Sequence, residues 1–89
     1  MEFEWDSLKA DTNSEKHGVS FEEAAEVFAD DLSSTIADPD HSLAEERFLI
    51  FGRTSSDRYL VVSFTDRDDR IRIISAREMT RLERKAYEQ

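Results

Sequence analysis

The sequence predicts a single small domain of the α+β class that spans residues 1–89. Helical patterns come early, strand patterns fill the stretch from about residue 33 to residue 75, and a last helical pattern follows. This order, β-α-α-β-β-β-β-α, separates helices from strands as α+β domains do. The chain contains only 2 Gly and 1 Pro, so it has little linker character. We therefore expect one sheet and one core.

The first elements follow from alternation and capping. Residues 2–5 alternate acidic and aromatic side chains, which predicts a short initial strand. Asp6 can cap a helix that runs to about His17, and Gly18 is suited to end it.

The second helix has a clearer signal. Ser20 and Glu23 form a capping-box pattern, and apolar residues recur at positions 21, 24, 25 and 28. A short strand at 33–37 and a turn or loop at 38–42 should follow.

Three further strand patterns should form an antiparallel meander. They lie at residues 47–54, 58–65 and 70–75. Two short polar connections separate them, as hairpins require. Alternation along the third strand places Arg70 and Arg72 on one face, opposite Ile71, Ile73 and Ser75.

The final helix should run from about Ala76 to Tyr87. Ser75 and Glu78 fit a second capping box, and apolar residues follow at helical spacing. This interpretation places Arg77 at the start of that helix.

The composition excludes several kinds of site. The chain has no cysteine, which excludes disulfides, thiolate nucleophiles and cysteine-based zinc sites. The two histidines and the scattered carboxylates do not form a metal-binding pattern. The longest apolar run is too short to cross a bilayer, and the N-terminus lacks the features of a signal peptide. We therefore expect a soluble cytoplasmic protein.

Charge is divided unequally along the chain. The net charge is −9, but residues 1–46 hold 14 acids and 2 bases, whereas residues 47–89 hold 7 acids and 10 bases. Such asymmetry indicates a charged binding surface. The alternative is that the late arginines simply solvate strands and a terminal helix.

A resemblance to a known family rests on motifs spread over nearly the whole chain. The motifs include Phe3-Glu4-Trp5-Asp6, Lys16-His17-Gly18, Arg58-Tyr59-Leu60-Val61-Val62 and Arg72-Ile73-Ile74-Ser75-Ala76-Arg77, of which the second and the last are highly specific when they occur together. In this order and spacing, from Phe3 to about Tyr87, the sequence resembles the BrnT toxins of type II toxin–antitoxin systems.

The resemblance implies a fold, an activity and a partner. It implies a RelE-like fold, in which an antiparallel sheet packs with two N-terminal helices and one C-terminal helix. It also implies RNA cleavage without a metal ion or other cofactor, which inhibits translation. The implied partner is a BrnA-like ribbon-helix-helix antitoxin in a heterotetramer, and DNA would be bound only through that antitoxin.

Metal-free RNA cleavage has specific chemical needs. The ribose 2′-hydroxyl attacks phosphorus, so the site needs a base, positive charge for the phosphorane and a proton for the leaving oxygen. Arginine suits the second task because its planar fork matches phosphate oxygens. The catalytic candidates that follow are Arg67, Arg72, Arg47, Arg77, His17, Glu46 and Asp66.

These candidates have different support. The resemblance favours Arg67 and Arg72, while Arg47 and Arg77 fit a solvated, carboxylate-paired role equally well. The base is left open among His17, Glu46 and Asp66, with His41 as a further histidine candidate. For Lys9 and Lys16 the alternative role is part of a solvated helix face, and for Lys16 this role is favoured over catalysis. A rival function is a non-catalytic binding module that acts with its antitoxin as a corepressor.

Overall fold

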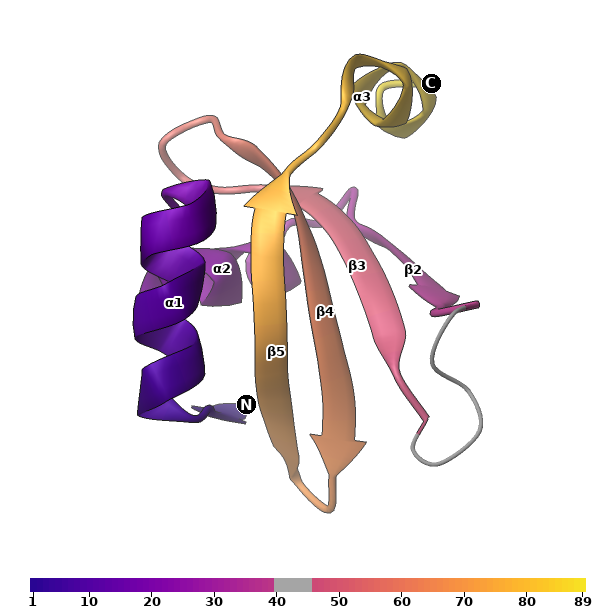
Figure 1. The fold of residues 1–89 in the computed structure, drawn as a ribbon. Coiled ribbons are helices and arrows are strands. Elements are labelled where there is room, and N and C mark those ends of the chain that lie inside the picture. Colours follow the sequence, from indigo (N-terminus) through magenta and orange to yellow (C-terminus); the bar gives the residue numbers. More distant parts are fainter. Residues whose placement is uncertain (40–45) are drawn as a thin grey trace.

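The computed structural model describes residues 1–39 and 46–89. His41, a candidate base in the sequence analysis, lies outside the described residues. Within them, an α+β domain is formed (Figure 1). Its elements are β1 (Glu2–Glu4), α1 (Ser7–His17), α2 (Phe21–Ala25), the 3-10 helix η1 (Glu26–Ala29), β2 (Ser34–Ala37), β3 (Phe48–Arg53), β4 (Tyr59–Arg67), β5 (Arg70–Glu78) and α3 (Arg81–Tyr87).

The five strands form one mixed sheet in the order β1-β5-β4-β3-β2. β2, β3, β4 and β5 pair antiparallel with their sequence neighbours. β1 pairs parallel with β5, in a register that sets Glu2 opposite Arg70 and Glu4 opposite Arg72. The prediction of a purely antiparallel sheet was therefore wrong, because it considered only strands that are adjacent in sequence.

The early helices begin at side-chain caps. The Asp6 carboxylate accepts hydrogen bonds from the N–H groups of Leu8 and Lys9, and the Ser20 hydroxyl accepts one from Glu23. Gly18 ends α1 in the left-handed conformation, with φ of 67°. The apolar stripe expected to extend one helix to residue 28 instead continues as the tighter turn of η1.

The core lies between one face of the sheet and the segment that contains α2 and η1 (Figure 1). Aromatic rings pack edge to face in this core. Phe28 of η1 contacts Phe3 of β1 and Phe64 of β4 in this way. The residues that form the buried cluster are Val19, Phe21, Ala24, Val27, Ile50, Leu60, Val62, Phe64, Ile73 and Ala76. Burial of this apolar surface is the main stabilising term of so small a domain.

A β-bulge in β5 decides which side chains share a face. Ser63 pairs with Ser75 and the next residue, Phe64, pairs with Ile73, so Ile74 is the extra residue. The alternation of side chains is reversed beyond it. Ser75 therefore lies on the face opposite Ile73, which corrects the prediction from strict alternation.

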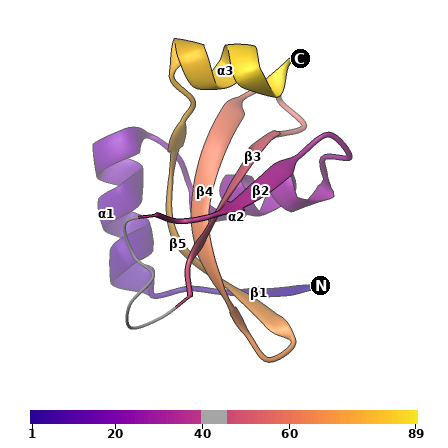
Figure 2. The ribbon, with the colours of Figure 1, turned by 90° about the vertical axis from the view of Figure 1, so that its right-hand side faces the viewer.

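The last helix begins later than the sequence predicts. Residues 76–78 continue β5 and pair with β4. α3 starts at Arg81, and Thr80 with Glu83 forms the capping box in place of Ser75 with Glu78. α3 lies across the end of the sheet (Figure 2). No helix of the described part is long and apolar enough to cross a membrane.

Candidate functional site

The candidate site is on the sheet face that points away from the core, which we call the second face. β4 and β5 supply its centre. Their registers place Thr65 opposite Arg72, Ser63 opposite Ser75, and Val61 opposite Arg77. Arg77 is five residues beyond Arg72, so without the bulge it would share the core face with Ile73. The bulge thus brings both arginines to one face.

An arginine cluster surrounds Glu4 at one end of this face. Arg72 donates a hydrogen bond of 3.0 Å from Nη1 to Glu4 Oε2. Arg67 Nη1 lies 3.9 Å from the same oxygen, and Arg70 Nη1 lies 3.6 Å from Oε1. Arg70 also approaches Glu2, at 3.5 Å. The hydrogen bond from Arg72, supported by the nearby guanidinium charges, lowers the pKa of Glu4 below its ordinary value.

The Glu4 cluster is an anion site already filled by a carboxylate. Three guanidinium groups lie near two carboxylates, those of Glu4 and Glu2, so the cluster carries one excess positive charge. Arginine forks bind phosphate oxygens with the geometry that they use for carboxylates. The carboxylates that pair with these arginines come from the distant strand β1.

Arg77 has a different carboxylate partner. Its Nη1 and Nη2 donate to Oε1 and Oε2 of Glu83 at 2.7 and 2.9 Å. This hydrogen-bonded pairing lowers the pKa of Glu83 to about 2 and raises that of Arg77. Arg77 lies on β5, and not at the start of a helix as the sequence predicted.

Arg77 also lines a small hollow on the second face. This hollow has a volume of about 260 Å³ and receives His17 from the end of α1, together with Ser63, Ser75 and Arg77 from the sheet. Asn13 holds α1 against β5, because its side chain donates to the Ala76 carbonyl and accepts from the Ala76 N–H. His17 is exposed. An imidazole and a guanidinium therefore line the same hollow as two hydroxyl groups.

The remaining candidates are only partly assembled. The Glu46 carbonyl accepts a hydrogen bond from the Thr65 hydroxyl, which places that segment beside the row that contains Arg72. The Arg47 carbonyl accepts from the Asp38 N–H just before β3. Asp66 pairs with Ile71, so alternation directs its side chain away from the second face. The structure therefore separates Asp66 from the arginines.

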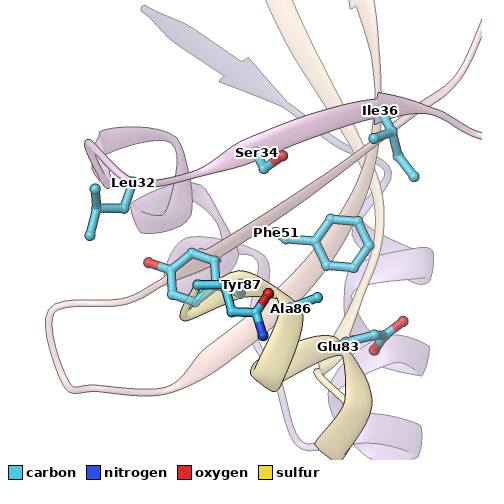
Figure 3. A pocket seen from close by; sticks show the side chains of 8 residues that line it. Leu32, Ser34, Ile36, Phe51, Glu83, Ala86 and Tyr87 are labelled. Carbon is cyan, nitrogen blue, oxygen red and sulfur yellow. The ribbon is translucent and has the colours of Figure 1, made fainter.

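A larger hollow beneath α3 has another character (Figure 3). It has a volume of about 430 Å³, and apolar side chains of α3, β2 and β3 line it. None of the described residues that line it is basic, so this hollow lacks the charge that phosphate requires. Glu83 lines it and also contacts Arg77, which places the partner of one candidate arginine on its wall.

Comparison with protein families decides the identity of the domain. Residues 5–83 match the family described as "Ribonuclease toxin, BrnT, of type II toxin-antitoxin system". The chain belongs to the BrnT family. Membership identifies a ribonuclease toxin of a type II toxin–antitoxin system, and such a system includes an antitoxin partner.

A solved BrnT structure has the same fold. The crystal structure of the Brucella abortus ribonuclease toxin BrnT, at 1.1 Å resolution, aligns with a TM-score of 0.66 and 24% identity. The alignment covers 91% of the present chain and 99% of the Brucella chain. No curated protein sequence matched this BrnT-family chain. The described residues also contain no group of three metal-binding side chains.

Sequence reasoning missed several residues of this BrnT-family surface. Glu4 and Glu83 were not identified as partners of candidate arginines, because the residues of each pair lie on different elements. Ser63 and Ser75 join the hollow only through the register beyond the bulge. A signal for Glu4 was present in the motif that opens the chain, but the motif alone does not name its contact.

Proposed function

We propose that this BrnT-family protein cleaves RNA on the second face without a metal ion. The observation that carries the proposal is the hollow shared by His17 and Arg77, on the same sheet face as the Glu4 cluster. These residues supply the groups that the chemistry needs. That the fold is RelE-like stays a prediction from the resemblance.

In the proposed reaction, the 2′-hydroxyl oxygen attacks the adjacent phosphorus while a base removes its proton. The bond from phosphorus to the 5′-oxygen breaks, the 5′-oxygen gains a proton, and a 2′,3′-cyclic phosphate is left. Arg77 stabilises the charge that develops on the phosphorane. His17 supplies the imidazole in the hollow, which can accept the proton of the 2′-hydroxyl or donate a proton to the 5′-oxygen. Glu46 is the alternative base, while Asp66 is disfavoured by its face.

The Glu4 cluster provides a second phosphate contact in this proposal. Arg67, Arg72 and Arg70 hold the RNA backbone beside the scissile bond. Arg47 comes directly before β3, the strand that pairs with β4. RNA must then compete with Glu4 for these guanidinium groups.

The decisive test is cleavage of RNA by the purified protein in EDTA. We expect cleavage to persist in EDTA and to fall about 100-fold in Arg77→Ala and His17→Ala. Arg81→Ala, which alters an exposed arginine of α3, serves as the control and should keep full activity. Cleavage that requires a divalent ion would overturn the metal-free mechanism.

The neutralised arginines favour a second candidate function. Arg72 and Arg77 both face carboxylates, as expected of a non-catalytic module that only binds its antitoxin and acts as a corepressor. Expression without the antitoxin separates the two functions. Growth arrest that Arg72→Ala relieves supports the ribonuclease, whereas absence of arrest supports the module.

We further propose that the antitoxin is BrnA-like and has a ribbon-helix-helix fold. Family membership supports this partner. Two toxins and two antitoxins would form a heterotetramer that contacts DNA through the antitoxin. Co-purification with such an antitoxin, followed by mass measurement in solution, tests the stoichiometry.

A further inference from the structure

The acid-rich half of the chain places its two bases in one groove. Residues 1–46 contain 14 acids, and their only bases are Lys9 and Lys16. Both lysines line a hollow of about 310 Å³ between α1 and β5. They are seven residues apart on α1, which is close to two helical turns, so they share one side of the helix and lie about 10 Å apart along its axis.

This hollow adjoins the one that contains Arg77. The two hollows share His17 and Ser75, so they form one groove along α1 and β5. Lys9, Lys16, His17 and Arg77 therefore line a single path. Their positions come from two elements that the Asn13 hydrogen bonds to Ala76 hold together.

The groove lacks the acidic side chains that are common elsewhere in this protein. The protein has 21 acids among 89 residues, yet none of the described residues that line either hollow is Asp or Glu. A phosphate backbone is repelled by carboxylates and attracted by lysine, so this path suits an RNA strand.

We propose that Lys9 and Lys16 bind the backbone of a single RNA strand next to the bond that is cleaved. This inference rests on the proposed ribonuclease function and adds to it the path that the RNA strand follows across the protein. The strand runs from the His17–Arg77 hollow along α1. Hollows of this size are in the lower range for small-ligand pockets, so each accepts nucleotide-sized groups and not a duplex.

The test measures binding separately from cleavage. A short single-stranded 2′-O-methyl RNA has no free 2′-hydroxyl to attack, so it reports affinity alone. Fluorescence anisotropy is measured across salt concentrations for the wild type, Lys9→Gln, Lys16→Gln and the double variant. Lys85→Gln removes the same charge from the exposed surface of α3 and is the matched control.

We expect the double variant to bind about tenfold more weakly than the wild type. Its salt slope should fall by about 1.4, because two phosphate contacts on a single strand are lost. Lys85→Gln should match the wild type. Equal affinity in the double variant and in Lys85→Gln would overturn the inference, as would a wild type that fails to bind the oligonucleotide.

The inference and the proposed function fail in different ways. If the wild type binds through Lys9 and Lys16 but does not cleave ordinary RNA, the RNA-binding groove is supported and the proposed ribonuclease function is refuted. If the wild type cleaves RNA, and the double variant has unchanged affinity and unchanged kcat/KM, the ribonuclease function is supported and the RNA-binding groove is refuted. Both lysines are exposed, so the variants should fold, and thermal unfolding checks this.

Discussion

Glu4 and Arg72 are direct partners across the parallel pairing of β1 and β5, with 3.0 Å between Oε2 and Nη1. The same carboxylate lies within 4 Å of Arg67 and Arg70. A single acidic side chain therefore occupies the position that a phosphate would take among these arginines.

Replacement of Glu4 by Gln should increase affinity for RNA. The substitution removes a competing anion and leaves the guanidinium groups in place, so we expect threefold to tenfold tighter binding, on the order expected for one charge, with a steeper salt dependence. Anisotropy with the 2′-O-methyl oligonucleotide measures both. Glu88→Gln, which frees Arg84 on α3, is the control. If the two variants bind alike, the Glu4 cluster is not on the path of the RNA.

Stability should fall in acid through the pair of Glu83 and Arg77. The pKa of Glu83 is lowered from 4.5 to about 2, first by its hydrogen bond with Arg77. Because the folded pKa lies below the ordinary value, this contribution is complete above pH 4.5 and is lost as pH falls toward 2. Half-exposed pairs contribute little, so we expect about 1 kcal/mol.

Melting temperatures at several pH values between 7 and 2 test this contribution. Glu83→Gln should show a smaller acid-induced drop than the wild type, whereas Glu15→Gln on the exposed surface of α1 should follow the wild type. The comparison is needed because the pKa values of Glu4 and Glu26 are also lowered, through hydrogen bonds with Arg72 and Ser55 respectively. An identical drop in Glu83→Gln would refute the assignment.

Asn13→Ala should destabilise the fold by about 2–4 kcal/mol. Asn13 is 6% exposed, and its amide donates to the carbonyls of Val19 and Ala76 and accepts from the Ala76 N–H. The substitution leaves buried backbone groups without partners, which is costly. Urea unfolding measures the loss. Asp11→Ala, at an exposed position two residues earlier on α1, should change stability by less than about 0.5 kcal/mol.

Gly52→Ala should also be destabilising, through a steric clash. A Cβ at this position would lie 2.6 Å from Val27 Cγ1 and 3.2 Å from the Val27 carbonyl oxygen. We expect a loss of about 1–3 kcal/mol, typical of overpacking. The double variant with Val27→Ala removes the nearer contact, so its loss should be smaller than the sum of the two single losses. Simple additivity would show that the methyl group is accommodated elsewhere.

The sequence was most informative where a structure is set by neighbouring residues. Asp6 and Ser20 act on N–H groups two or three positions away, so their role as caps can be predicted without a fold. Capping alone did not locate the last helix, because Ser75 with Glu78 and Thr80 with Glu83 show the same pattern. Pairing of residues 76–78 with β4 excludes the first choice.

Longer-range relationships were beyond the sequence patterns. The parallel contact of β1 with β5 joins residues that are 68 positions apart, such as Glu4 and Arg72. The bulge at Ile74 changes the face of every later residue in β5, and no local signal marks it. Chemistry alone could predict that arginines would form the candidate site. Their carboxylate partners and the lysine groove depend on the register of the strands, which the sequence patterns do not give.

The pairing of β1 with β5 also sets an order of events during synthesis. Residues 2–4 have no strand to join until residues 70–72 have been made. Contacts this distant in sequence form late, since a long loop must close first. A nascent chain that stops short of β5 therefore has no assembled arginine surface, so the proposed RNA-binding face forms only as synthesis of this domain nears its end.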